Sequence, residues 1–380
     1  MIEKRALLRN AILTGAIVLV AGCKVIPKGP PVIAPTPVPT EETSGTLPGD
    51  RDRHRVALLV PLSGSNAGVG QSIANATTMA LLDTNAQNLR ITTYDTATGA
   101  QSAAARALAD GNKLILGPLL NEDVRAVAAA ASPARVPMIT FSNDSRVAAD
   151  DVFVLGHVPA QSIARTVSFA KARGASRFAA LIPTGEYGQR AGDAFAAAVK
   201  AAGGTVAATE GYDRGNTSVT SAAQRLKAKG GYDAVLIADG ARIASRAAPA
   251  LKNPAMRILG TELWAGESAI TSTPALRGAW YSAVSDARFA QFAASYKSRF
   301  GNQPYRIATL GYDGVLLTLR VARDWRPGAL FPTRRLADRG GFLGLDGAFR
   351  FSADNVAERS WEVREVGTGT VSPAPARFAD

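Results

Sequence analysis

The sequence predicts an α/β protein with two doubly wound, Rossmann-like lobes and a central cleft between them. Short apolar, β-branched runs alternate with longer alanine-rich stretches of helical character, a pattern typical of parallel βαβ units. The series pauses after Val152-Phe-Val-Leu155 and restarts at Phe178-Ala-Ala-Leu-Ile182. The roughly 330 residues that follow a proline-rich N-terminal stretch are enough for two domains of ordinary size.

The first series predicts a lobe of four strands and three helices. Its first strand is the apolar run Arg55-Val-Ala-Leu-Leu-Val-Pro61, and a loop at 63–70 leads into the first helix. Strands are expected at 55–61, 89–95, 113–117 and 136–142, and helices at 71–85, 99–110 and 121–131.

The second series predicts a similar lobe, followed by two helices and a hairpin. A helix at 159–173 is expected to precede strands at 178–182, 205–212, 233–238 and 256–260, with helices at 188–202, 217–229 and 241–251. After an apolar run at 280–284, helices are expected at 286–299 and 304–325. Alternation in Ala348-Phe-Arg-Phe351 and Trp361-Glu-Val-Arg-Glu-Val366 predicts a hairpin within 341–366.

Two lobes of this kind place a cleft at the carboxyl ends of their strands. In open α/β sheets, ligands bind in the crevice outside those ends. We therefore expect six loops to face the cleft, and they begin at Pro61, Gly117, Ser142, Pro183, Asp239 and Thr261.

Residues 1–23 have the features of a lipoprotein signal peptide. A basic start at 4–9 precedes an apolar run at 11–20, which is shorter than the roughly 20 residues of a membrane-spanning helix. Small residues then come directly before Cys23, the only cysteine of the sequence. This arrangement predicts a lipobox, with Cys23 as the lipid-bearing N-terminus of the mature protein. An ordinary signal peptide or an uncleaved anchor with an incidental cysteine is the alternative.

Residues 24–52 are predicted to form an extended tether. They are rich in proline and poor in large apolar residues, so they cannot bury a core and should stay near the polyproline II conformation. Lys24 stands where an aspartate would, by resemblance to Gram-negative lipoproteins, favour retention at the inner membrane. We therefore expect a lipid anchor on the periplasmic side of the outer membrane, in preference to the inner membrane.

The chain is strongly basic, with a formal net charge of +12 and a pI near 10.1. The arginines and lysines are scattered, and no basic stretch interleaved with aromatic residues indicates a nucleic-acid partner. The charge instead suits anionic lipid head groups, acidic cell-wall polymers or an acidic protein partner. A merely solvated, arginine-rich surface is the alternative.

No catalytic site is predicted. The one cysteine is the predicted lipidation site, so no Cys/His metal cluster can form with the two histidines, His54 and His157. No Gly-x-Ser-x-Gly elbow occurs, and the glycines of Gly64-Ser-Asn-Ala-Gly-Val-Gly70 do not have the spacing of a dinucleotide fingerprint. We therefore assign no catalytic residue, metal ligand or cofactor, and expect His157 to be held at a lobe crossing by a local hydrogen bond. Paired carboxylates for glycoside hydrolysis stay an alternative, drawn from Asp95, Glu186, Asp239 and Glu262.

Five short motifs carry a resemblance to a known family. They are Val56-Ala-Leu-Leu-Val-Pro-Leu-Ser-Gly64, Leu116-Gly-Pro-Leu119, Val136-Pro-Met-Ile-Thr-Phe-Ser-Asn143, Tyr187-Gly188 and Gly344-Leu-Asp-Gly-Ala-Phe-Arg-Phe351. Their order over about 53–366 resembles the type I periplasmic-binding-protein fold. The resemblance implies that the chain crosses between the lobes three times. Lobe 1 would then be 53–155 plus about 285–325, lobe 2 would be 156–284 plus about 326–366, and 367–380 would be a loose tail.

Two relatives within that fold imply different functions. One is the Leu/Ile/Val-binding protein of ABC importers, and the other is the penicillin-binding protein activator, a lipoprotein that regulates peptidoglycan synthases. The lipobox, the tether, Pro61-Leu-Ser-Gly64 and Leu116-Gly-Pro-Leu119 look more like the activators. We therefore expect a membrane-anchored, non-enzymatic lipoprotein that regulates peptidoglycan synthesis through a synthase partner. The alternative is a solute-binding protein of a branched-chain amino-acid transporter.

A retained amino-acid pocket would implicate eight residues by the same resemblance. They are Ser63, Gly64, Gly117, Ser142, Asn143, Tyr187, Asp239 and Glu262. Hydroxyls and backbone N–H groups would hold the ligand carboxylate, and Glu262 would hold its ammonium group. Each residue also has a purely structural interpretation as a turn, a cap, a packed ring or a solvated charge. Leu119 and Leu120 depart from the serine or threonine that the amino-acid binders place near the carboxylate.

Overall fold

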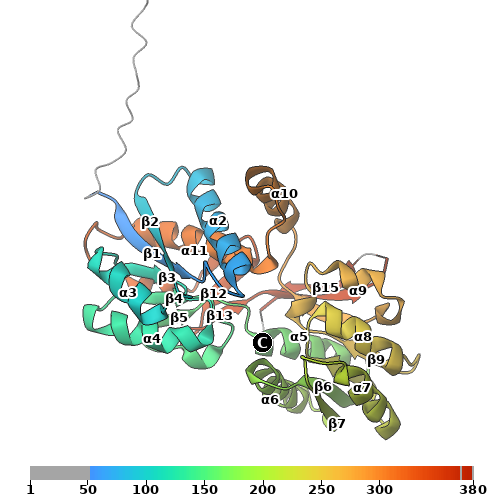
Figure 1. Ribbon diagram of the computed structural model, residues 1–380. Helices are drawn as coiled ribbons and strands as arrows, with labels where there is room; N and C mark the ends of the chain where they lie inside the picture. Colours follow the sequence, from blue (N-terminus) through green and yellow to red (C-terminus); the bar gives the residue numbers. More distant parts are fainter. Residues whose placement is uncertain (1–51, 369, 379–380) are drawn as a thin grey trace, which may run out of the picture. The chain divides into compact units, whose positions relative to one another are not determined.

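The computed structural model describes residues 52–368 and 370–378 (Figure 1). The predicted signal peptide, Cys23 and nearly all of the tether lie outside these residues. Among the described helices, none combines the length and the apolar character that crossing a membrane requires.

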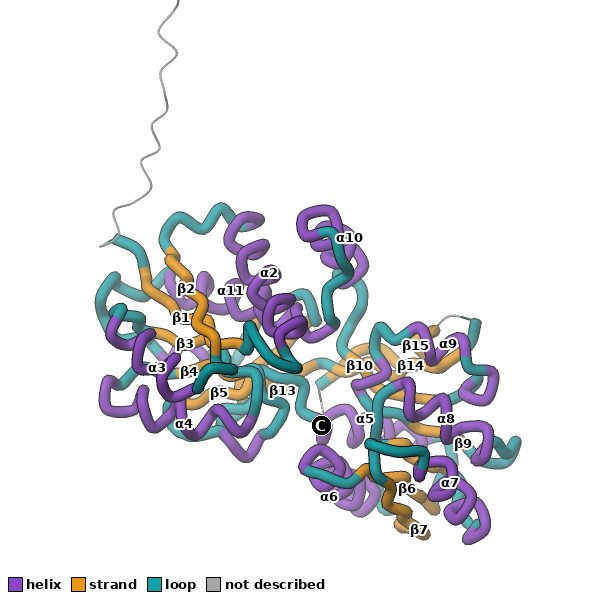
Figure 2. Tube along the Cα trace, viewed as in Figure 1, coloured by secondary structure: helices purple, strands orange, loops and turns teal. Residues whose placement is uncertain are grey.

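Lobe 1 is built on a five-stranded parallel sheet with the order β2-β1-β3-β4-β5. Its strands are β1 (His54–Val60), β2 (Leu89–Asp95), β3 (Leu114–Leu116), β4 (Met138–Thr140) and β5 (Val152–Val154). The helices between them are α2 (Ala67–Asp83), α3 (Ala100–Ala109) and α4 (Asn121–Ala131). β1 is buried along nearly its whole length because helices cover both faces of the sheet (Figure 2).

The alanine-rich stretches become helices with a narrow buried face, as α3 shows. Ala100, Ala103, Ala104 and Ala107 recur at the spacing of one helix face, and all four are buried against the sheet. Alanine also has the highest helix propensity. Its small side chain lets α3 and α4 pack side by side on this face of the sheet.

Lobe 2 is built on a seven-stranded sheet with the order β15-β14-β10-β9-β8-β6-β7. Its parallel strands are β6 (Arg177–Pro183), β7 (Thr205–Tyr212), β8 (Ala234–Ile237), β9 (Arg257–Leu259) and β10 (Trp280–Ala283). Its helices are α5 (Pro159–Ala172), α6 (Glu186–Ala201), α7 (Ser218–Lys229), α8 (Ala241–Leu251) and α9 (Ser268–Ser272). The predicted α/β class with two doubly wound lobes is therefore confirmed.

After β10 the chain returns to lobe 1. Helix α10 (Phe289–Phe300) packs Phe292 and Tyr296 against α2, and α11 (Thr309–Ala322) also lies along α2. The helices approach closely at Gly311, where an added Cβ would lie 2.6 Å from the carbonyl oxygen of Ile73. Single 3₁₀ turns occur at η1 (Ser132–Ala134), η2 (Ser145–Val147), η3 (Glu262–Trp264), η4 (Pro274–Leu276), η5 (Arg306–Ala308) and η6 (Thr333–Ala337).

Antiparallel pairing occurs within 341–366 as predicted, but the two alternating runs do not pair with each other: the first pairs with its neighbours in sequence and the second with the lobe 2 sheet. The assignment of all of 326–366 to lobe 2 is wrong. β11 (Phe342–Gly344), β12 (Gly347–Phe351) and β13 (Ala357–Arg359) form a separate antiparallel sheet. The phenylalanines of this sheet bury their rings in the core of lobe 1. Only β14 (Trp361–Val366) joins lobe 2, where it pairs with β10. The alternation marked the buried faces correctly but could not show against which lobe they pack.

The C-terminal segment, predicted to be loose, is largely a strand. β15 (Thr370–Arg377) pairs antiparallel with β14 at the edge of the lobe 2 sheet. Most of its side chains are exposed, so main-chain hydrogen bonds hold it in place. Its sequence therefore lacks the apolar pattern that would predict a strand.

In each lobe, a glycine lies near the start of the helix that follows the first strand. An added Cβ at Gly70 in α2 would lie 1.8 Å from the carbonyl oxygen of Pro61, at the end of β1. An added Cβ at Gly188 in α6 would lie 1.7 Å from the carbonyl oxygen of Pro183, at the end of β6. Because no side chain fits at either position, each helix begins directly against a strand end, beside the cleft.

Candidate ligand-binding site

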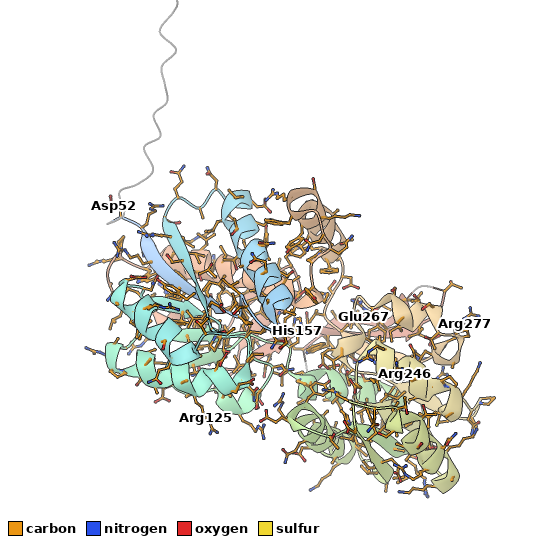
Figure 3. The ribbon with its side chains drawn as sticks, in the orientation of Figure 1. Asp52, Arg125, His157, Arg246, Glu267 and Arg277 are labelled. Atoms are coloured by element: carbon orange, nitrogen blue, oxygen red, sulfur yellow. The ribbon has the colours of Figure 1, made fainter. Side chains whose placement is uncertain are left out.

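A cavity of about 440 Å³ lies where the two lobes meet. Its walls are largely apolar, with Val69, Leu119, Phe141, Leu263, Ala265 and Ile307 among the lining residues. Leu119, Phe141, Leu263 and Ala265 come from the segments that follow β3, β4 and β9, which is the edge where strand order predicts a ligand site, whereas Val69 lies in α2 and Ile307 in η5. His157 and Glu267, which also line it, are labelled in Figure 3.

Glu262 is the buried acid of this cavity. It begins η3, separated from the end of β9 by two residues, and Oε1 accepts a hydrogen bond from the Tyr187 hydroxyl at 3.1 Å. The other oxygen, Oε2, is buried and has no hydrogen-bond partner among the described residues. The Ser162 hydroxyl beside this carboxylate donates instead to the carbonyl oxygen of Ser282 at 2.9 Å. Burial raises the pKa of Glu262 to about 7.

Tyr187 fixes the position of the Glu262 carboxylate through a hydrogen bond. Its hydroxyl lies 3.3 Å from the Thr261 hydroxyl as well as 3.1 Å from Glu262, and the Arg214 guanidinium lies over its ring. Burial, reinforced by the charge of Glu262, raises the pKa of this phenol well above its ordinary value. The phenol therefore stays protonated and donates to the carboxylate.

Polar contacts join the lobes beside the cavity. Asn143, which lines it from lobe 1, accepts a hydrogen bond from Arg190 Nη2 of α6 at 3.2 Å. The same guanidinium lies 3.3 Å from the carboxylate of Asp144. Asn121 of lobe 1 donates to Glu186 of lobe 2 at 2.7 Å.

A buried carboxylate, Asp346, organises the other polar side of the cavity. It accepts hydrogen bonds from Arg306 and, at 2.8 Å each, from the Thr309 hydroxyl and His157 Nε2. Burial opposes its ionisation, but Arg306 and His157 hold the pKa of Asp346 well below its usual range. Burial lowers the pKa of His157, so the imidazole donates to Asp346 as a neutral ring. The bond spans 189 residues of sequence, so the predicted hydrogen bond exists but is not local.

Only some of the eight residues predicted from the sequence lie at the cavity. Asn143 and Glu262 line the cavity, and Tyr187 contacts Glu262. The Ser63 hydroxyl donates to Asp95 at 2.9 Å in an exposed turn that includes Gly64. An added Cβ at Gly117 would lie 2.1 Å from the carbonyl oxygen of Leu59, so this glycine serves chain packing.

Ser142 and Asp239 serve local structure instead. The Ser142 hydroxyl accepts a hydrogen bond from the backbone N–H of Asp144 at 3.1 Å. Asp239 accepts from the Tyr212 hydroxyl at 2.7 Å and from Arg214 at 2.8 Å, and it lies outside the cavity lining. Neither residue is among those that line the cavity.

Sequence reasoning did not assign Arg306 or His157 to the site. His157 stood out only as one of two histidines, and no pattern marks Arg306. Among the described residues, no group of three or more His, Cys, Asp or Glu side chains is placed to hold a metal ion.

Comparison with known proteins identifies the family. The sequence profile of a periplasmic binding protein family matches residues 54–370. The chain is a periplasmic binding protein. Membership of this family implies a periplasmic location. An uncharacterized protein of Rickettsia prowazekii is 31% identical over 136 residues, which are 35% of this chain and 36% of that relative.

Solved structures show the same fold as this periplasmic binding protein. A putative branched-chain amino acid ABC transporter protein from Rhodospirillum rubrum has a TM-score of 0.71 at 20% identity, covering 86% of this chain and 100% of its own. A solute-binding protein from Rhodopseudomonas palustris, in complex with 3,4-dihydroxybenzoic acid, has a TM-score of 0.69 at 21% identity, covering 87% and 98%. A branched-chain amino acid binding protein from Streptococcus pneumoniae, in complex with isoleucine, has a TM-score of 0.66 at 18% identity, covering 86% and 100%. The type I periplasmic-binding-protein architecture is thus confirmed.

Proposed function

We propose that this protein is a non-enzymatic solute-binding protein that takes a small, largely apolar molecule with a hydrogen-bond donor into the cavity between its lobes. The observation that carries this proposal is Glu262, which lines the cavity and leaves Oε2 without a partner. A buried acceptor without a partner costs roughly 1–3 kcal/mol. A ligand ammonium or hydroxyl group would remove that cost.

The cavity walls indicate the rest of the ligand. Leu119, Phe141 and Ile307 offer an apolar surface for an aliphatic or aromatic body. The hydroxyl of Ser63 is engaged by Asp95, and Leu119 replaces a hydroxyl donor, so the donors left for a ligand carboxylate are other side chains of the lining, such as Asn143, Tyr305 and Arg306. The solved relatives in complex with isoleucine or 3,4-dihydroxybenzoic acid support a ligand of this size.

Three ligands with one aliphatic body separate the roles of amine and carboxylate. Leucine, isopentylamine and isovalerate are compared by thermal unfolding and calorimetry of the protein. We expect the two amines to bind, with about 2.7 kcal/mol of stabilisation at a hundredfold excess over Kd, and isovalerate to bind at least tenfold more weakly. Glu262→Gln should lower the affinity for both amines tenfold or more, whereas Glu267→Gln, at an exposed lining acid, should change it little.

The raised pKa of Glu262 gives this binding a defined pH dependence. Because the pKa is about 7, the ionised fraction grows from about a tenth at pH 6 to about nine-tenths at pH 8. Amine affinity should therefore rise about tenfold over that range, and not at all in the Gln variant. A pKa raised on folding removes stability as pH rises towards 7, so the uncharged variant should be at least as stable as the wild type at pH 8. Equal amine affinity in the Gln variant would contradict the proposal.

Penicillin-binding protein activation is a second candidate function. The observation in its favour is the apolar lining that lobe 1 contributes to the cavity. Leu119 and Leu120 stand where an amino-acid binder needs hydroxyl donors, which weakens the case for a transported amino acid. In this function the protein would bind a peptidoglycan synthase and raise its rate of glycan polymerisation or crosslinking. A purified synthase whose rate stays unchanged, together with thermal stabilisation by leucine, would exclude it.

We also propose that Cys23 carries a lipid that anchors the protein to the periplasmic face of the outer membrane. The basic start, the short apolar run and the small residues before the cysteine support this. Radiolabelled palmitate should be incorporated by the wild type and lost in Cys23→Ser, and the labelled protein should sediment with outer-membrane fractions. Label retained in the serine variant would refute acylation at this site.

A further inference from the structure

The segment that follows α11 is unusually basic. Residues 320–339 contain six arginines against two aspartates and no lysine or glutamate. All six side chains are exposed, and we call them the basic face: Arg320, Arg323, Arg326, Arg334, Arg335 and Arg339.

Buried apolar side chains hold this segment in place. Trp325, Phe331 and Leu336 belong to the core of lobe 1, and the rings of Trp325 and Phe331 meet edge to face at 5.1 Å. Trp325 Nε1 also donates to the carbonyl oxygen of Ala329 at 3.0 Å. Leu330, between these anchors, is 50% exposed. The arginine side chains therefore point into solvent from a segment that its buried residues hold in place, and the exposed Leu330 lies among them.

Most of these cations have no partner within the described chain. Arg335 pairs with Asp324 at 3.1 Å, but Arg323, Arg326 and Arg334 make no ion pair among the described residues. Some basic residues of lobe 2 are paired within the chain, as where Arg225 and Lys229 share the carboxylate of Glu210. Unpaired like charges close together repel one another, and a negatively charged surface would relieve that repulsion.

The basic face lies where the tether joins the body. Trp325 stacks on His54, with ring centroids 4.2 Å apart and 12° between the planes, and His54 is the first residue of β1. Asp52, the first described residue, lies at the opposite end of lobe 1 from His157 (Figure 3). Anything attached through residues 1–51 thus joins the body beside these arginines. The cavity lies at the carboxyl ends of the strands, away from this end of β1.

We propose that the basic face binds the anionic head groups of a lipid bilayer, with Leu330 entering the interface. Arginines near an anionic surface and an apolar side chain at the head-group boundary together produce peripheral membrane binding. This contact leaves the cavity directed away from the membrane. The proposal is independent of solute binding and of acylation.

The test uses the fragment 47–380, a compact unit that contains the cores of both lobes and lacks Cys23. It is sedimented with vesicles of phosphatidylcholine alone or with phosphatidylglycerol added, at low and high salt. We expect binding only to the anionic vesicles, weakened by salt. The triple variant Arg323→Glu, Arg326→Glu, Arg334→Glu should lower the partition coefficient at least about a hundredfold, because each arginine contributes about fivefold. Leu330→Ser should lower it severalfold.

The matched control reverses three arginines of lobe 2. Arg242, Arg246 and Arg277 are exposed, and Figure 3 shows the latter two on that lobe. Their change to glutamate alters the net charge equally and should leave most of the binding intact. Arg323→Gln, Arg326→Gln, Arg334→Gln, checked by near-ultraviolet circular dichroism, controls for misfolding. Three results would each overturn the assignment to a lipid surface. The first is an equal loss of vesicle binding in the triple glutamate variant of lobe 2. The others are no binding to anionic vesicles at low salt and an equal affinity for soluble polyglutamate.

Discussion

Asp346→Ala is expected to lower the free energy of unfolding by about 3–5 kcal/mol, as is usual when one partner of a buried ion pair is removed. Asp346 is fully buried and accepts hydrogen bonds from Arg306, His157 and Thr309. Without it, the Arg306 guanidinium loses its buried counter-charge. The buried Arg359, whose Nε and Nη1 atoms already lack partners, loses a neighbouring negative charge.

The adjacent acid Asp313 will offset part of this loss. Burial, reinforced by the charge of Asp346, raises the pKa of Asp313, so Asp313 ionises more readily once Asp346 is gone. The double variant Asp313→Asn, Asp346→Ala should therefore be less stable than Asp346→Ala alone. Urea unfolding followed by circular dichroism measures both, with Asp354→Ala at an exposed aspartate as the control. A loss below about 1 kcal/mol for Asp346→Ala would show that this network does not stabilise the fold.

Gly188→Ala is expected to cost about 3 kcal/mol of stability, the upper end for overpacking. The new Cβ would lie 1.7 Å from the carbonyl oxygen of Pro183, and backbone on both sides must move to admit it. Gly70→Ala should have a similar cost in lobe 1, since its Cβ would lie 1.8 Å from the carbonyl oxygen of Pro61.

Gly240→Ala provides the matched control for both glycine variants. Gly240 also stands between a lobe 2 strand and its helix, but an added Cβ there meets nothing within 4 Å, and its φ is −67°. Alanine at this position should cost less than about 1 kcal/mol. If all three variants unfold at the same urea concentration, the close helix–strand approach does not contribute to stability.

Much of the architecture follows from local pattern. The run from Val56 to Val60 is apolar at every position, and helices indeed cover it on both faces. The alanines of α3 mark one helix face, and they are the ones buried. Errors arose where the same pattern admits two partners. Phe349 and Phe351 alternate as a strand should, but which lobe receives their rings depends on where the chain crosses.

The candidate site was only partly predictable for a similar reason. Asn143 and Glu262 follow strands at their carboxyl ends, and they line the cavity. Asp239 follows a strand in the same way, but Tyr212 and Arg214 satisfy its carboxylate. Asp239 and Glu262 look alike in sequence. Which of them keeps a free oxygen depends on the hydrogen-bond donors around each carboxylate, and the local sequence does not show these donors.

The sequence by itself determined the α/β alternation, the two-lobed plan and the edge at which the cavity lies, since apolar periodicity and strand order are local properties. Only the tertiary structure decided which acid keeps an unpaired oxygen and which is neutralised. It also decided that residues far apart, His157 and Asp346, meet at a chain crossing beside the cavity. The physical reason is that burial and hydrogen-bond satisfaction depend on contacts between segments, and these exist only once both lobes have folded and the chain has passed between them.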